Sequence, residues 1–261
     1  FLPFPPQLLL DSGGQSCERT RFPPSRYRAG REYSGSGHER KLNRRVTERM
    51  NLLSPSDPIV LSTAYLPPIQ YFTKLLHPEG VLLETAENFV KQSYRNRCHI
   101  AGPEGMQPLT IPVEKSPSPK APIRDIRISE HGNWRHLHLN ALISSYGSAP
   151  FFDHYMTEIE LFYRHKYTFL WDFNLDLLSV CLEWLDISPL IMFTSEYVED
   201  CPNDFRYSIR PKQAPEDESF RPRVYYRTFA HKYGFLPNLS IVDLIFHEGP
   251  SAIQTLKECI R

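Results

Sequence analysis

Long apolar runs are missing from this 261-residue chain. No stretch reaches about 18 apolar residues, so we expect no segment that spans a bilayer. Cysteine is also scarce: the five cysteines, at positions 17, 98, 181, 201 and 259, form no CxxC pair and are odd in number. This pattern favours reduced thiols in a cytoplasmic protein over a secreted disulfide framework or a cysteine zinc site. We interpret Cys98 and Cys181 as core residues.

An excess of charge of one sign is absent as well. The chain has 30 basic and 30 acidic residues, but residues 1–50 hold ten Lys or Arg against five Asp or Glu, which leaves the remainder mildly acidic. This balance argues against nucleic acid as a partner, because a nucleic-acid-binding surface needs concentrated positive charge.

The usual catalytic motifs are missing too. The sequence contains no GxxxxGK[ST] phosphate loop, no GxGxxG after a strand, no GxSxG and no HExxH. His136 and His138 are two residues apart, so on a helix they point in nearly opposite directions and cannot share one metal. We therefore assign no metal ligand, and the sequence identifies no cofactor.

Residues 1–49 differ in composition from the rest. They combine proline pairs, Gly-Ser repeats and scattered arginines without a regular apolar period. Such a segment cannot bury enough apolar surface to offset the entropy of ordering it. The first Met is Met50. We predict a disordered or misassigned leader over residues 1–49 and a single folded domain over residues 50–261.

The folded region reads as a mixed α/β domain, with helices packed on one mixed sheet. Strands are predicted near residues 58–62, 81–87 and 123–129, with a hairpin over 93–114 and a late buried strand at 190–198. Helices are predicted at 69–77, 133–146, 151–167 and 168–187, and two more follow residue 238, where Asn238 or Ser240 caps one and Pro250 starts the other. Residues 199–223 are polar and proline-rich, which indicates a long mobile loop.

The stretch FVKQSYRNRCHIAG at 89–102 surrounds an Asn with basic residues. Strand alternation places Arg95, Arg97 and His99 on one face and Tyr94, Asn96 and Cys98 on the other. One interpretation is an edge strand protected by charge. The other is an anion-binding strand, because the planar guanidinium of Arg donates two parallel hydrogen bonds to carboxylate or phosphate.

The predicted helix at 133–146 carries Trp134, His138, Leu142 and Tyr146 along nearly one face. Such a stripe is compatible with the core, where the histidine would be hydrogen-bonded. It is also compatible with the lip of a pocket, where His138 would act as a general acid or base near neutral pH.

Five ordered blocks resemble the WbqC-like protein family: AYLPPIQYF (64–72), KQSYRNRCHI (91–100), LTIPV (109–113), NWRHLHLNALISSYGSAPFF (133–152) and GFLPNLSIVDLIFHEGP (234–250). The similarity covers roughly residues 58–260. That family is encoded among O-antigen and other surface-polysaccharide genes, and a member has been proposed as a glycine transferase.

The resemblance implies a cytoplasmic step in surface-glycan biosynthesis: transfer of a small amino-acid or acyl group, possibly glycine, to a sugar or nucleotide sugar. A non-catalytic module that binds a nucleotide sugar or a partner glycosyltransferase is the alternative. The substrate would carry an anionic group.

The positions that match the polar signature of the family are Tyr65, Lys91, Asn96, Arg97, Trp134, His138, Tyr146, Asn238 and Asp243. In this interpretation Lys91 and Arg97 hold the anion, Asn96 orients an amide or hydroxyl, and His138 moves a proton. For Asn238 and Asp243 a structural role is a strong alternative, because LPNLSIVDL is also a good capped helix start in which they would only fix the turn. The chain departs from the family at Thr63-Ala64, where many members have Gln-Pro, and at YYRTF (225–229), where a Gln is usual.

Overall fold

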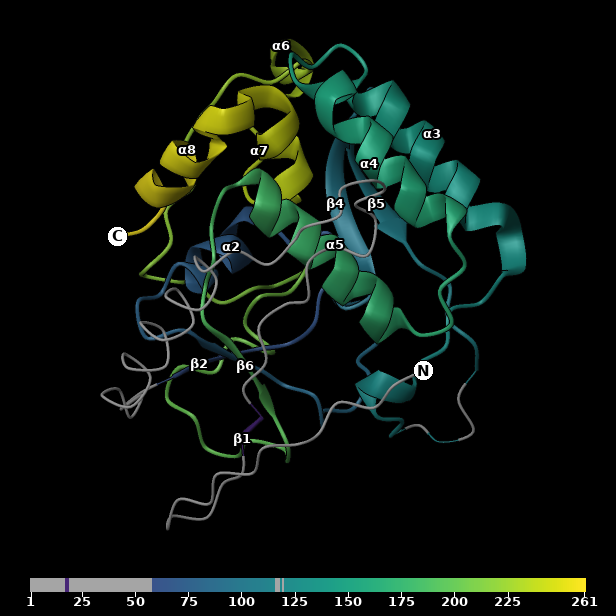
Figure 1. Cartoon of the computed structure of the whole chain (residues 1–261). Helices are drawn as coiled ribbons and strands as arrows, with labels where there is room; N and C mark the ends of the chain where they lie inside the picture. Colours follow the sequence, from purple (N-terminus) through teal and green to yellow (C-terminus); the bar gives the residue numbers. More distant parts are fainter. Residues whose placement is uncertain (1–16, 19–57, 116–117, 119) are drawn as a thin grey trace, which may run out of the picture.

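Three short parallel strands organise the molecule in the computed structural model, which describes residues 17–18, 58–115, 118 and 120–261 (Figure 1). Strands β2 (Ile59–Leu61), β3 (Val81–Leu83) and β6 (Ile191–Thr194) pair in parallel, with Ile59 opposite Val81 and Leu83 opposite Phe193. β1 (Cys17–Glu18) pairs antiparallel with β6 and gives the sheet order β1-β6-β3-β2. The mixed α/β fold is therefore confirmed. Apart from β1, the predicted leader lies outside the described residues.

A separate hairpin is formed by β4 (Arg97–Gly102) and β5 (Gly105–Thr110). Gly102 faces Gly105 across a two-residue turn, and Gly105 has a φ of +101°, a conformation that glycine adopts without steric cost. Helix α3 (Trp134–Tyr146) packs on β4 and is followed by α4 (Phe152–Arg164). These three helix and strand predictions are confirmed.

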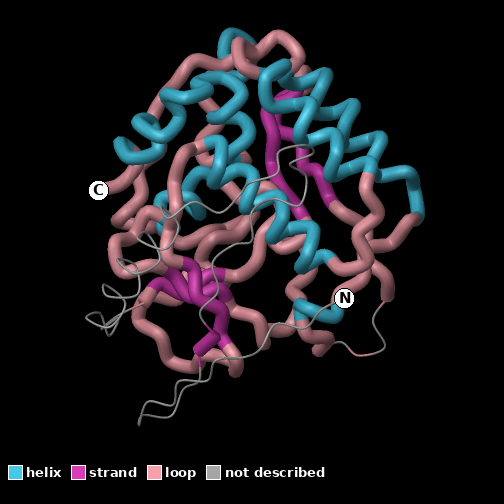
Figure 2. Tube along the Cα trace, in the orientation of Figure 1, coloured by secondary structure: helices cyan, strands magenta, loops and turns pink. Residues whose placement is uncertain are grey.

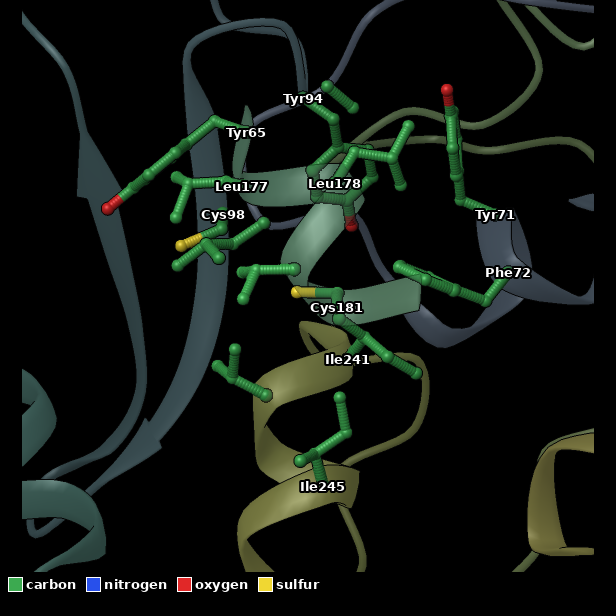
Figure 3. Close-up of a cluster of buried hydrophobic side chains, with 14 of the residues drawn as sticks. Tyr65, Tyr71, Phe72, Tyr94, Cys98, Leu177, Leu178, Cys181, Ile241 and Ile245 are labelled. Carbon is green, nitrogen blue, oxygen red and sulfur yellow. The ribbon is translucent and has the colours of Figure 1, made fainter. Parts of the chain in front are cut away.

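Helix α5 (Leu170–Trp184) is buried on most of its surface and crosses the middle of the molecule (Figures 1 and 2). Figure 3 shows its residues Leu177, Leu178 and Cys181 beside Cys98 of β4 and Ile241 of α7. Burying such side chains contributes roughly 25 cal/mol per Å² of apolar surface removed from water. Cys98 and Cys181 are core residues, as predicted.

The remaining helices are short. α2 (Ile69–Leu75) connects β2 to β3, and it begins after Pro67-Pro68 and ends before Pro78. Near the C-terminus, α6 (Ala230–Tyr233) precedes α7 (Ile241–Glu248), η3 (Gly249–Ser251) and α8 (Ala252–Glu258). Within the part of the chain that the structure describes, no helix is long and apolar enough to cross a membrane.

Residues 123–129 do not form the predicted strand. They begin with a 3₁₀ turn, η1 (Ile123–Asp125), and continue through isolated bridges that join Arg127 to Phe169 and Ile128 to Val113. Ile123 and Ile126 are three residues apart, and a 3₁₀ turn places that spacing on one side, so both side chains reach the core. A second short 3₁₀ turn, η2 (His131–Asn133), leads into α3.

Candidate functional site

Polar side chains gather where the three parallel strands end. Ser62 follows β2, Glu84 follows β3, and Thr194 is the last residue of β6. The Thr194 hydroxyl donates to Glu84 Oε1 at 2.7 Å, and the amide of Ala86 donates to the same oxygen at 2.9 Å. In open α/β sheets ligands bind at the carboxyl ends of the strands, so this edge is the first place to look for a site.

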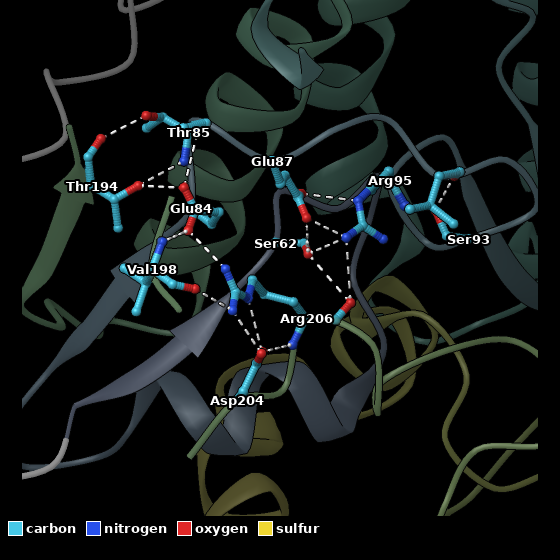
Figure 4. A network of polar contacts seen from close by, with 12 residues as sticks. Ser62, Glu84, Thr85, Glu87, Ser93, Arg95, Thr194, Val198, Asp204 and Arg206 are labelled. Carbon is cyan, nitrogen blue, oxygen red and sulfur yellow. Dashed lines mark hydrogen bonds and ion pairs between the residues drawn. The ribbon is translucent and has the colours of Figure 1, made fainter. Parts of the chain in front are cut away.

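Two arginine–glutamate pairs lie buried at this edge (Figure 4). Arg206 Nη1 is 2.8 Å from Glu84 Oε2, and the same guanidinium binds Asp204. Arg95 Nε donates to Glu87 Oε1 at 2.9 Å. Both glutamates are fully buried, and both arginines nearly so. A buried charge is tolerated only when it is paired and hydrogen-bonded, and these pairs meet that condition.

Ser62 joins Glu87 to Arg95. Its hydroxyl donates to Glu87 Oε2 at 3.0 Å and accepts from Arg95 Nη2 at 2.7 Å. Burial raises the pKa of Glu87, and the hydrogen bonds from Arg95 and Ser62 oppose that rise. The network fixes the loops that follow β2, β3 and β6 and thereby shapes the surface above them.

A cleft of about 630 Å³ opens beside this network. Thr85, Ala86 and Ser195 border it at the strand ends, Arg124 and Asp125 come from η1, and Phe169, Trp171 and Asp172 come from the start of α5, with Pro122 completing the lining. Arg124, Asp125 and Asp172 are exposed, whereas Trp171 is buried against the wall. The cleft thus combines apolar surface from Phe169 with three exposed charged groups.

Three of the residues predicted from sequence meet in the core. Tyr65, Trp134 and His138 form an aromatic cluster with Tyr163 and Phe173. The Tyr65 hydroxyl is 2.9 Å from His138 Nδ1 and also bonds the Tyr163 hydroxyl. All five side chains are buried.

His138 is held in the core by its neighbours. Its Nδ1 lies 2.9 Å from the Tyr65 hydroxyl, and its ring packs against Trp134 and Tyr163. Burial lowers the pKa of His138 to about 4. His138 is therefore a neutral core histidine, and the structure does not place it at the lip of the cleft.

Tyr146 and Asp243 meet in a second buried cluster. Asp243 Oδ2 is 2.7 Å from Arg227 Nε and accepts a hydrogen bond from Tyr225 at 2.6 Å. The Tyr146 hydroxyl accepts from the amide of Ala101 at 3.2 Å, and burial raises its pKa, with the charge of Asp243 adding to the rise. This cluster joins α3, α7 and the segment before α6.

Asn238 caps a helix, but a different one from that predicted. Its side chain accepts from the amide of Gln70 and donates to the Gln70 side chain, both at 2.9 Å, so it satisfies the start of α2. Ser240 precedes α7 without a side-chain cap bond and instead donates to the carbonyl of Leu66.

Replacing Asn238 by alanine is expected to lower the free energy of unfolding by about 1–2 kcal/mol, the usual cost of a lost helix cap. The φ of +53° at this position adds to the cost, because asparagine adopts this left-handed conformation more readily than alanine does. Urea denaturation measures the effect. Asn140→Ala, on the exposed face of α3, is the matched control and should change stability by less than about 0.5 kcal/mol. Equal losses in the two variants would contradict the cap.

The basic stretch at 91–97 is not one strand. β4 begins at Arg97, and Lys91, Arg95 and Asn96 lie in the turns before it. The predicted common face of Arg95, Arg97 and His99 is therefore wrong, because Arg95 turns inward to Glu87 while Arg97 Nε donates to Thr110 Oγ1 at 3.0 Å.

The other polar residues of this stretch divide between surface and core. Lys91 is exposed. Asn96 is buried and donates to the carbonyl of Ile111 at 2.9 Å. The structure thus distributes the predicted site residues over the aromatic cluster, the Asp243 cluster, the start of α2, the turns before β4 and the first residue of β4.

Sequence reasoning missed Glu84, Glu87 and Arg206, which hold the network at the strand ends. For Glu84 a signal existed, because an acidic residue directly after a buried apolar strand lies at its carboxyl end. Arg206 had no such signal, since it lies in the loop predicted to be mobile. That loop contains no helix or strand from Glu199 to Arg223, yet its Arg206 is packed in the core.

Among the described residues, no three His, Cys, Asp or Glu side chains are grouped as a metal ion would require. The protein is therefore an α/β protein, and its best candidate for a functional site is the cleft beside the buried network at the carboxyl ends of the parallel strands.

The model of the WbqC-like protein family matches residues 63–213 of this chain, and the chain belongs to that family. An "Uncharacterized protein Rv1507c" of Mycobacterium tuberculosis (strain ATCC 25618 / H37Rv) is 24% identical over 225 residues, which cover 77% of this chain and 97% of that protein. No solved structure matches the chain. The family match spans β3, the hairpin, α3 to α5, β6 and Arg206, so it includes most of the candidate site.

Proposed function

We propose that this protein is a transferase of surface-glycan biosynthesis, acting in the cytoplasm, that binds a sugar or nucleotide sugar in the cleft and attaches a small amino-acid or acyl unit to it. The observation that carries the proposal is the cleft itself, which lies at the carboxyl ends of the parallel strands and is lined by aromatic rings and exposed charged groups.

The lining suits a sugar. Asp125 and Asp172 accept hydrogen bonds from hydroxyl or ammonium groups, and the half-buried ring of Phe169 offers apolar surface to a pyranose. Arg124 is suited to a carboxylate or phosphate, and each hydrogen bond to such a charged group contributes about 1.5–3 kcal/mol. With two carboxylates and one guanidinium, the cleft favours a ligand whose anionic group is confined to the Arg124 side.

Amide or ester formation from an acyl or aminoacyl thioester joins the amine or hydroxyl to the acyl carbon and breaks the C–S bond, so the thiolate leaves. It requires a base that accepts the proton of the attacking amine or hydroxyl. Asp125 and Asp172 are exposed in the cleft and are the groups we propose for that role. The role that the resemblance implies for His138 would require the ligand to reach the aromatic core.

A second candidate function is binding without catalysis, in the same pathway. It is supported by the enclosed, neutral state of His138 and by the burial that raises the pKa of the Cys98 and Cys181 thiols, which removes them as nucleophiles.

The test of the site is a thermal-shift and calorimetric screen of the full chain against sugar acids, amino sugars and nucleotide sugars. A ligand at 100 times its Kd stabilises the native state by about 2.7 kcal/mol. We expect Arg124→Ala to weaken the ligand that binds by at least about tenfold, because it removes a charged hydrogen bond. Arg164→Ala, on the exposed side of α4, is the matched control and should leave affinity unchanged.

Equal affinity in wild type, Arg124→Ala and Asp172→Asn would refute the cleft as the site. Product formation from an activated thioester donor separates the two candidate functions. A protein that binds the sugar, responds to Arg124→Ala and forms no product with any donor is a binding module.

A further inference from the structure

Two tyrosines project from the loop that follows β6. Tyr197 is 41% exposed and Tyr207 is 45% exposed, although both belong to a loop that is anchored in the core by Arg206. The positions of these half-exposed rings are fixed, because the loop that carries them is anchored and each ring packs on a buried arginine.

Each ring lies against a buried guanidinium. The guanidinium carbon of Arg206 is 4.4 Å from the centre of the Tyr197 ring, and that of Arg95 is 5.4 Å from the centre of the Tyr207 ring. Both guanidinium groups are themselves held by the buried glutamates. Tyr197 is 41% and Tyr207 is 45% exposed, so part of each ring stays open to solvent beside its arginine. Rings fixed in this way lose little conformational entropy when a ligand stacks on them.

The two tyrosines also interact with each other. Burial raises the pKa of Tyr207 to about 12, and a side-chain hydrogen bond with Tyr197 contributes to the rise. We call these two rings, each lying against a buried guanidinium, the tyrosine platform (Tyr197 and Tyr207).

Tyr197 of the tyrosine platform is close along the chain to the lining of the cleft. Ser195 lines the cleft and is two residues before Tyr197, a distance of at most about 7 Å along the chain. On the other side of Tyr197, the amide of Val198 donates to Glu84 Oε2 at 2.9 Å, and Glu84 is next to Thr85 in the cleft wall.

The arginines decide which ligand suits these rings. A sugar binds an aromatic face through polarised C–H groups, which need the negative potential of that face, and a cation on the opposite face reduces this potential. Stacking of a flat heteroaromatic ring depends mainly on contact area and dispersion, so it is less affected.

We propose that the tyrosine platform binds the base of a nucleotide whose sugar portion occupies the cleft. This proposal rests on the proposed function and narrows its substrate class to nucleotide sugars.

The test is calorimetric titration of the full chain with uridine monophosphate, adenosine monophosphate and, as a base-free probe, ribose 5-phosphate. We expect the nucleotides to bind more tightly than ribose 5-phosphate. Tyr207→Ala and Tyr197→Ala should each weaken nucleotide binding at least fivefold, which corresponds to about 1 kcal/mol of base stacking. Tyr207→Phe keeps the ring and should retain most of the affinity.

Tyr226→Ala is the matched control, since Tyr226 is 63% exposed and is not part of the tyrosine platform. Equal binding of nucleotides and ribose 5-phosphate, no nucleotide binding, or equal losses in Tyr207→Ala and Tyr226→Ala would each overturn the platform. The Arg124→Ala test with nucleotide-free sugars measures sugar binding in the cleft by itself. Sugar binding in the cleft can therefore be confirmed even if the tyrosines do not bind a base.

Discussion

Replacement of Arg95 by alanine is expected to lower the free energy of unfolding by about 3–5 kcal/mol, the cost of breaking a buried ion pair by removing one partner. The substitution leaves the carboxylate of Glu87 fully buried without the cation that pairs with it. It also removes the hydrogen bond from Arg95 Nη2 to Ser62. Urea denaturation at pH 7 measures the loss.

Arg97→Ala is the matched control, because Arg97 is two residues away, partly exposed and bonded to a threonine hydroxyl. Its cost should stay below about 1 kcal/mol, the usual range for a single neutral-acceptor hydrogen bond near the surface. The double variant Glu87→Gln with Arg95→Met removes both charges and should be more stable than Arg95→Ala. If Arg95→Ala costs no more than Arg97→Ala, the buried pair does not hold this edge of the sheet.

Acidification from pH 7 to pH 5 is expected to remove about 2 kcal/mol of stability through His138 alone. Burial lowers the pKa of His138 to about 4 in the folded protein, from 6.5 in the unfolded chain. The unfolded state therefore binds more protons as the pH falls below 6.5, and stability decreases with a limiting cost of 1.36 kcal/mol per pH unit. The contribution is fully present above pH 6.5 and is lost between pH 6.5 and pH 4.

Comparing the wild type with His138→Gln isolates this effect, because glutamine does not titrate and can still bond Tyr65. The wild type should lose about 2 kcal/mol more than His138→Gln between the two pH values. His136→Gln, on the exposed face of the same helix, is the control and should keep the pH dependence of the wild type. A wild type and His138→Gln with parallel pH profiles would mean that His138 is accessible to protons, as a catalytic residue in the cleft would be.

The helices and buried strands were predictable because their signals are local. The proline pair before Ile69, Gly147 after α3 and Pro150 before α4 mark element boundaries in the sequence itself. The strand predicted at 123–129 failed because its isoleucines are spaced both for a strand and for a 3₁₀ turn. Tertiary contacts with Phe169 and Thr168 decide between the two.

The candidate site was predictable only in part. The resemblance pointed to Tyr65, Trp134 and His138, and the structure brings those three together, but in the core. The residues at the strand ends form pairs over long distances along the chain, such as Arg206 with Glu84, which are 122 positions apart. No local pattern marks such a partner, and Arg206 in isolation resembles any arginine of a polar loop.

The long separation of these partners also determines when the site can form. Thr194 and Glu84, 110 residues apart, meet only when β6 inserts beside β3, and Arg206 follows later still. Parallel pairing over such distances loses the entropy of closing a long loop before any contact between the strands stabilises it. We therefore expect it to be slower than formation of the hairpin or of single helices. During synthesis the two glutamates emerge more than a hundred residues before the arginine that pairs with Glu84. A nascent chain therefore has the hairpin and helices α3 to α5 before Arg206 can complete the network at the strand ends, so the candidate site is completed late in synthesis.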